Sequence, residues 1–161
     1  VPVAEPPLMP GLGFQFLWHR AAATDLPDNG PSDGQGPYFP LPGGVRWLVF
    51  TVPAERRPPA EGTDLVAAAA ATEAMLPGLR ATMEPGNPGM HRSDTVDFVY
   101  VLEGEVVLEL DDGLETTLRA GDSLVQNGTR HAWRNRCGKP CRMLVVMLGA
   151  ARKGDPSSRR D

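Results

Sequence analysis

The sequence has few cysteine, histidine and aromatic residues, and it lacks any long apolar run. Two of the 161 residues are cysteine, three are histidine and 6% are aromatic. No window of about 18 apolar residues occurs, which argues against a membrane-spanning helix. Cys137 and Cys141, in CGKPC, are too few for a closed zinc site with four ligands. We expect them to be free thiols in a turn between strands.

The chain has no excess of positive charge. Sixteen Lys and Arg residues stand against twenty Asp and Glu residues, which gives a net charge of −4. Residues 150–161 hold four basic and two acidic residues, so the rest of the chain carries −6. Such a domain is a poor partner for nucleic acid. The stretch from Val1 has neither the basic nor the apolar segment of a signal peptide, and we expect a cytoplasmic protein that contacts no membrane.

Glycine and proline, in contrast, are abundant, with 18 and 17 residues. This composition disfavours a helical bundle and favours many short strands joined by turns. Twelve of the prolines lie in residues 1–60, where only residues 12–18 and 45–52 are typical of strands. The link 25–44 between them consists of turn-forming residues, and it is long enough to be either a functional cover or a mobile loop.

One helix is predicted within residues 63–76, with Thr63 or Asp64 as its N-cap and with Pro77 and Gly78 ending it. Seven short segments follow, and turns such as DDG separate them without helices. We expect strands over 79–85, 97–104, 105–112, 115–121, 123–128, 131–136 and 142–149. Strands joined by such short turns pair antiparallel, which predicts a sandwich or a small closed barrel.

Two of the three histidines lie in distinctive stretches, GMHRSDTVDFVYVLEGEV and GDSLVQNGTRHAWRN. The first resembles the first motif of the cupin superfamily of small β-barrels, which has a His-x-His pair, a Glu and, after six residues, a Gly. If Gly104 is that glycine, the other positions fall on His91, Ser93 and Asp97. The sequence thus resembles a cupin variant with Ser in place of the second histidine and Asp in place of Glu.

The second stretch resembles the second cupin motif, which runs from a Gly through a turn to a His and then an Asn. Gly121, Gly128, His131 and Asn135 take these positions, and the turn is Asn-Gly rather than Pro-Gly. The resemblance covers roughly residues 78–149. It implies an all-β, antiparallel double-sheet cupin barrel of the jelly-roll type, with a Pro/Gly-rich N-terminal extension and one short helix.

The resemblance also implies an organisation of the chain. Residues 1–78 would be the N-terminal extension, with two strands, a long loop and a short helix that pack on the barrel. Residues 79–149 would be the barrel core, and residues 150–161 a disordered tail. The whole is expected to form one structural domain.

The family's ligand positions imply that His91, Asp97 and His131 bind a divalent transition metal (Fe, Zn, Mn or Ni). Two imidazoles and one carboxylate are the ligands of non-haem iron sites, and they also suit catalytic zinc. Asp94 is an alternative carboxylate, although the alternation of a strand would point it away from the other two. Without metal, the two histidines could act as acid and base near neutral pH, since histidine titrates there. The remaining alternative is that the histidines are structural, and we expect His19 to lie at the surface.

Strand alternation indicates which other residues line the barrel interior. If His131 points inward, so does Trp133, which could stack on a planar substrate. Gln126 and Arg80 are further candidate substrate contacts. If Asp97 points inward, an apolar row faces outward, formed by Phe98, Tyr100 and Leu102. This row needs a cover from the N-terminal segment or from a second subunit, and we expect a C2 homodimer that uses the N-terminal strands.

The functional hypothesis is therefore a metal-binding cupin enzyme. It would act on a small oxygenated or carboxylated organic molecule in the barrel, as a dioxygenase, a decarboxylase or a lyase or isomerase. Because a fold does not choose among reactions, the reaction class stays open. The alternatives are a non-catalytic cupin that binds or senses a small molecule without metal, and a mainly structural dimer.

Overall fold

A computed structural model describes residues 1–28, 30, 32–34 and 36–153 of the chain. The main sheet has five strands in the order β1-β2-β8-β3-β6. These strands are β1 (Gly13–Arg20), β2 (Val45–Val52), β8 (Cys141–Gly149), β3 (Thr95–Glu103) and β6 (Ser123–Asn127). A second sheet, in the order β5-β4-β7, consists of β5 (Glu115–Arg119), β4 (Glu105–Glu109) and β7 (Ala132–Arg134). All pairings are antiparallel, which confirms the predicted double-sheet all-β class.

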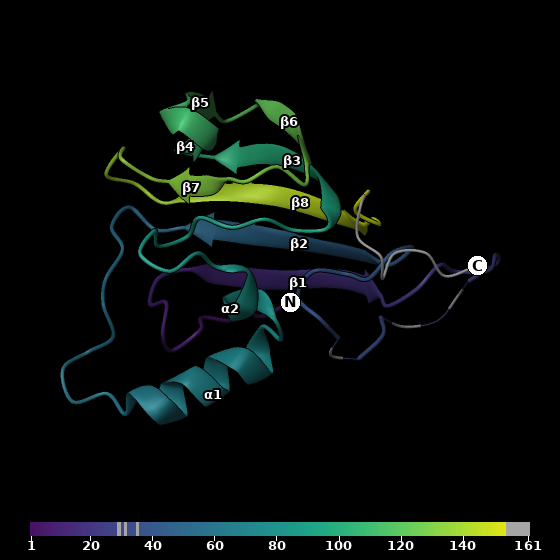
Figure 1. Cartoon of the computed structure of the whole chain (residues 1–161), viewed down its shortest axis with the longest axis horizontal. Helices are drawn as coiled ribbons and strands as arrows, with labels where there is room; N and C mark the ends of the chain where they lie inside the picture. Colours follow the sequence, from purple (N-terminus) through teal and green to yellow (C-terminus); the bar gives the residue numbers. More distant parts are fainter. Residues whose placement is uncertain (29, 31, 35, 154–161) are drawn as a thin grey trace.

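The N-terminal strands are part of the main sheet. β2 pairs with β8 along its whole length, from Val45 opposite Leu148 to Val52 opposite Cys141, and β1 adds the edge beyond β2. Figure 1 shows the sheet with the helices α1 (Leu65–Met75) and α2 (Leu79–Thr82) on the β1 side. The predicted tail extends from residue 150, and its residues 154–161 lie outside the described part of the chain.

Helix α1 begins and ends as the sequence predicts. The Asp64 carboxylate accepts hydrogen bonds from the amides of Val66 (2.9 Å) and Ala67 (3.0 Å), which satisfies two amides that a helix start leaves unpaired. Gly78 then adopts a left-handed backbone with φ of +81°, which glycine tolerates without steric cost. Among the described residues, no helix is long and apolar enough to span a bilayer.

The predicted strand over residues 79–85 is wrong, because the segment starts as the short helix α2. Its apolar residues Leu79 and Met83 are spaced by four, which places both on one side of a helical turn, and both line the same internal cavity. The Thr82 hydroxyl donates to the Leu79 carbonyl at 2.7 Å, which closes the turn. The apolar residues of LRATM alternate with polar ones as in a strand, but the four-residue spacing of Leu79 and Met83 also fits one side of a helical turn, and the structure adopts the helix.

The alternation of β3 is as predicted. Val99 and Val101 are buried, whereas Phe98, Tyr100 and Leu102 are each more than 40% exposed. The inward sides of both sheets form the hydrophobic core, together with residues of the N-terminal segment and with Leu76 and Leu79 of the helical segment. Burial of each large aliphatic side chain stabilises the fold by about 1.5–3 kcal/mol. Cys137 and Cys141 are both free thiols, the first exposed and the second buried on β8.

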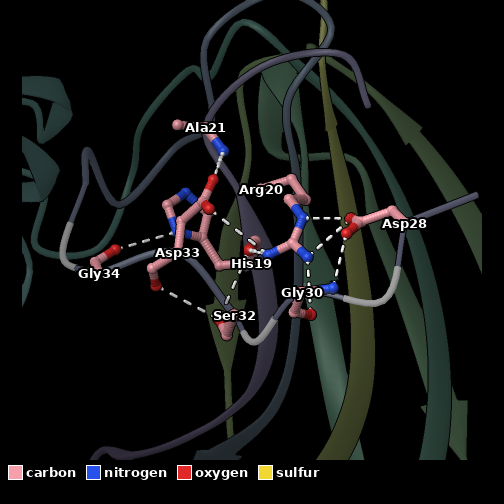
Figure 2. A network of polar contacts seen from close by, with 8 residues as sticks. All are labelled: His19, Arg20, Ala21, Asp28, Gly30, Ser32, Asp33 and Gly34. Atoms are coloured by element: carbon pink, nitrogen blue, oxygen red, sulfur yellow. Dashed lines mark hydrogen bonds and ion pairs between the residues drawn. The ribbon is translucent and has the colours of Figure 1, made fainter. Parts of the chain in front are cut away.

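His19 is buried, which corrects the expected surface position. The loop after β1 folds back onto the strand, so that the Asp33 amide donates to the His19 carbonyl at 3.0 Å. Figure 2 shows the adjacent Arg20 at the centre of this loop. Its guanidinium donates to Asp28 (2.7 Å) and to the Gly30 carbonyl (2.9 Å). These contacts from the turn-rich link cover the ring that the strand pattern alone would leave exposed.

Candidate functional site

The two motif histidines are joined through the main chain. The His91 amide donates to the His131 carbonyl, and the His131 amide donates to the His91 carbonyl, each at 3.0 Å. This reciprocal pair is an isolated antiparallel bridge between the two motif segments. It brings the two imidazole centroids to 4.4 Å from one another. The two residues that the sequence singled out are therefore adjacent in space.

Backbone carbonyls orient both imidazoles. Nδ1 of His91 lies 3.0 Å from the Gly89 carbonyl, and Nδ1 of His131 lies 2.9 Å from the Thr129 carbonyl. Since a carbonyl can only accept, each Nδ1 carries the proton and each Nε2 keeps its lone pair. Burial lowers the pKa of both rings, and for His131 the neighbouring His91 adds to the effect and brings the pKa to about 4. Both rings are therefore neutral at pH 7.

Asp97 is the buried acid of the site. It lies in the middle of the main sheet, with Met147 of β8 on one side and Gln126 of β6 on the other. Its side-chain atom Oδ1 is buried and has no hydrogen-bonding partner among the described residues. Burial raises the pKa of this carboxyl to about 6. An unpartnered carboxylate oxygen in the interior indicates a group available to a ligand.

These three side chains line one cavity of about 350 Å³. Its wall is mostly apolar, and Trp133 contributes to it as predicted. The other lining residues are Leu8, Met9, Pro10, Leu12, Phe14, Tyr38, Phe39, Phe50, Arg56, Arg57, Leu79, Met83, Pro88, Gly89, Val99, Val145 and Met147. An apolar cavity with a few convergent polar groups is the usual form of a small-molecule site.

Aromatic rings enclose the imidazoles. The Phe39 ring stacks on His91 with a centroid distance of 5.6 Å, and the Trp133 ring meets His131 edge-on at 5.9 Å. These rings restrict the rotation of the histidines and keep them in an apolar environment. This environment is the physical reason for the lowered histidine pKa values.

Ion pairs hold the loop that orients His91. Arg130 donates to both carboxylate oxygens of Glu84, at 2.6 and 2.7 Å, and so ties the start of the loop to the second motif. Arg134 donates to the Pro88 carbonyl, to the Asn87 side chain (2.8 Å) and to a carboxylate of β4. Bidentate arginine–carboxylate pairs fix geometry better than single contacts. The Gly89 carbonyl that accepts from His91 is therefore well positioned.

Three further candidates from the sequence lie outside the cavity. Gln126 is buried, but its amide donates to the Thr129 hydroxyl instead of facing a ligand. Arg80 is exposed on α2 and does not line the cavity, because the helical turn points Leu79 and Met83 inward instead. Asp94, the alternative carboxylate, is exposed and pairs with Arg152 at 2.6 Å, as strand alternation indicated.

Sequence reasoning missed three polar residues of the cavity wall: Tyr38, Arg56 and Arg57. Tyr38 comes from the turn-rich link, and burial together with the Asp97 charge raises the pKa of its phenol far above the ordinary value. It therefore remains a hydroxyl that can donate a hydrogen bond. For the arginines, the sequence offers only a basic pair in the Pro-rich segment after β2. Such a pair does not indicate that the segment passes the cavity.

The three side chains are of the types that bind a divalent metal, but they are not arranged around one point. Two neutral imidazoles and the unpartnered Asp97 oxygen are suitable donors for a divalent transition metal. Within the described part of the chain, however, no three His, Cys, Asp or Glu side chains converge closely enough to hold one ion. The predicted metal site at His91, Asp97 and His131 therefore stays a prediction.

Residues 79–147 match the cupin domain family. The phomopsin biosynthesis cluster protein D of Diaporthe leptostromiformis is 47% identical over 70 residues, which are 42% of this chain and 37% of that protein. The cupin-domain-containing oxidoreductase virC of Hypocrea virens is 42% identical over 62 residues, covering 37% of this chain and 32% of the relative. Each match therefore spans only about a third of the relative's length.

The solved structures that match this chain have low sequence identity and TM-scores below 0.5. The cupin 2 conserved barrel domain protein from Salinispora arenicola has a TM-score of 0.46 and 15% identity, over 91% of this chain and 82% of that one. A cupin superfamily protein from Desulfitobacterium hafniense has a TM-score of 0.40 and 15% identity, over 65% and 67% of the two chains. On its family match, this chain contains a small cupin domain over residues 79–147.

Proposed function

We propose that this protein is a cupin enzyme that binds a small oxygenated organic molecule in the cavity and transfers a proton through Asp97. One observation carries the proposal. Asp97 Oδ1 has no partner among the described residues, and it belongs to a mostly apolar cavity that two neutral imidazoles also line. The relatives named oxidoreductases, such as virC of Hypocrea virens, support an enzyme rather than a purely structural protein.

Asp97 is a better proton acceptor than His131. A general base is most effective when its pKa lies near the working pH. The pKa of Asp97 is raised to about 6, whereas that of His131 is lowered to about 4. At pH 7.5 Asp97 is therefore mostly ionised, and it is a stronger base than an ordinary carboxylate. His131 is the weaker base, and the two neutral imidazoles suit a different role.

The neutral imidazoles and the Tyr38 phenol orient the bound molecule. Each Nε2 can accept a hydrogen bond from a hydroxyl group, while the Tyr38 hydroxyl can donate one to a carbonyl oxygen. In the proposed step, Asp97 takes a proton from carbon next to that carbonyl, and the bonding electrons form an enolate. The protonated Asp97 then returns the proton to another atom of the substrate. The reaction is therefore an isomerisation without net oxidation.

Solvent exchange tests this proposal before the substrate is known. A panel of small β-diketones and α-hydroxy ketones is incubated with the protein in D₂O, and deuterium incorporation is followed by NMR. We expect enzyme-dependent exchange of at least one compound, which Asp97→Asn abolishes. Asp94→Asn is the matched control, since Asp94 is an exposed carboxylate of the same segment, and it should exchange like the wild type.

The alternative is a cupin that binds a small molecule without turnover, which the mostly apolar wall also allows. Ligand-observed NMR on the same samples separates the two. Binding without exchange by any compound would favour the binding module. Equal exchange by wild type and Asp97→Asn would contradict the role of Asp97 in an enzyme.

A further inference from the structure

Two adjacent arginines lie at the rim of the cavity. Arg56 and Arg57 belong to the segment between β2 and α1, and both line the cavity although they are exposed to solvent. They are the only cations of a wall that is otherwise mostly apolar among the described residues. A cationic rim above an apolar cavity suits a ligand with an anionic end and an apolar body.

Arg56 stands close to the residues that position the imidazoles. Its Nη2 atom lies 3.4 Å from the Trp133 carbonyl. A Cβ atom added to Gly89 would come within 2.5 Å of the same nitrogen, so the guanidinium covers this glycine. Gly89 is the residue whose carbonyl orients His91, and Trp133 packs against His131. The charge of Arg56 therefore lies at the side of the cavity that holds both histidines.

Neither rim arginine has a carboxylate partner among the described residues. Arg130 and Arg134, which hold the neighbouring loop, both pair with carboxylates at 2.6 Å. For Arg56, the contact to the Trp133 carbonyl is long, and Arg57 has no ion pair within the described part of the chain. Asp97 is the one carboxylate of the described cavity wall, and it is buried rather than paired with the rim. The positive charges of the rim thus have no carboxylate counter-charge among the described residues, whereas those of the nearby Arg130 and Arg134 do.

We infer that Arg56 and Arg57 bind the carboxylate of the substrate, which is therefore an organic acid with an apolar body. The planar guanidinium matches the planar carboxylate and can donate two parallel hydrogen bonds to it. The apolar body would enter the cavity toward Asp97 and the imidazoles. This inference rests on the proposed function and adds the substrate class and two specificity-determining residues.

Calorimetric titration with two pairs of compounds tests the inference. Octanoate and 4-phenylbutanoate are each compared with the corresponding amide, which has the same shape without charge. The double variant Arg56→Gln, Arg57→Gln removes the rim charges. The double variant Arg80→Gln, Arg92→Gln is its control, because it removes two exposed arginines that do not line the cavity. Melting temperatures verify that both variants fold.

We expect wild type and control to bind a carboxylate more tightly than its amide. The rim variant should lose about tenfold or more in carboxylate affinity, the size of a charge-assisted hydrogen bond, and keep its amide affinity. Equal binding of acid and amide by the wild type, or equal loss in both variants, would overturn the inference. Tighter binding of octyl phosphate than of octanoate would also overturn it, in favour of a phosphate site.

The titrations with the amides distinguish a failure of this inference from a failure of the proposed function. If an amide binds in the cavity but the acid gains nothing from the arginines, the cavity remains a ligand site and only the carboxylate assignment fails. If neither acids nor amides bind, the cavity proposal fails together with the inference. Competition between a bound amide and the exchange-active ketones shows whether both occupy the same cavity.

Discussion

The main chains of His91 and His131 form two reciprocal hydrogen bonds of 3.0 Å. The backbone bridge between the two motif segments thus positions the imidazole pair, whose ring centroids lie 4.4 Å apart. Each ring is then oriented by a carbonyl two residues before it, that of Gly89 or Thr129. Replacement of a ring should therefore leave the bridge intact, which makes side-chain variants informative about chemistry.

His131 should make the protein less stable as the pH falls. Its pKa is lowered from 6.5 to about 4 in the folded state, so the unfolded chain binds more protons between these values. The stability that the neutral ring contributes is complete above pH 6.5 and is lost toward pH 4. The loss amounts to about 3 kcal/mol at most, because one pKa unit corresponds to about 1.4 kcal/mol. Urea unfolding across this range should show a flatter pH dependence for His131→Gln, and an unchanged slope would contradict the buried neutral ring.

Asp97 should change the stability in the opposite direction, so that the protein becomes more stable as the pH falls. Its pKa is raised from 3.8 to about 6, so burial of the ionised carboxylate destabilises the fold above pH 6, and the cost disappears as the pH falls. Asp97→Asn should therefore increase the free energy of unfolding at pH 7.5 by about 1–3 kcal/mol. The exposed ion pair of Asp94 contributes little, so Asp94→Asn should not stabilise the protein. A less stable Asp97→Asn variant at pH 7.5 would show that the favourable contacts of the carboxylate, such as the hydrogen bond from Thr95, outweigh the cost of its burial.

Much of the barrel could be predicted from local pattern. The DDG turn and the strands around it follow from turn chemistry, and the inward side of β3 follows from alternation. The motif spacing placed His91, Asp97 and His131 on one cavity, as the structure shows. These features depend on residues that are near in sequence or on a motif spacing that resembles that of the family.

The remaining features depend on contacts between distant segments. The strand predicted at Leu79 became a helix because its apolar residues pack at helical spacing against the cavity. His19 became buried because the loop held by Arg20 folds over it. The rim arginines and Tyr38 reach the cavity through the path of irregular segments, which have no periodicity to interpret. Local pattern cannot predict such placements, because tertiary packing decides them.

Any metal bound by the imidazoles should depend on His131 more than on Asp97. No three ligating side chains converge within the described residues, so the arrangement supports the histidine pair but not the predicted three-residue site. Titration with Ni²⁺ is expected to show a site that Asp97→Asn retains and His131→Gln loses, since imidazole suits nickel. Loss of the site in Asp97→Asn would instead establish the three-ligand centre. Cys137→Ser serves as the control for binding at the exposed thiol.

The outward face of the main sheet should bind a second copy of the chain. Phe98 and Tyr100 are 46% and 47% exposed on β3, and β2 adds Trp47 at 42%. The N-terminal strands extend this face instead of covering it, because β2 pairs edge to edge with β8. An exposed apolar area of this kind is typical of an interface, and a closed dimer would bury it. Light scattering at tens of micromolar should therefore give about twice the chain mass of 17.3 kDa.

Charge on this face should then separate the copies. The variant Phe98→Glu, Tyr100→Glu introduces two carboxylates where the sheet is apolar, and desolvating unpaired charges in an interface is costly. We expect the monomer mass for this variant, with a circular dichroism spectrum like that of the wild type. Leu114→Glu is the matched control, because Leu114 is an exposed apolar residue at 62% that lies outside the main sheet. A monomeric wild type, or a dimer that survives the double substitution, would refute this interface.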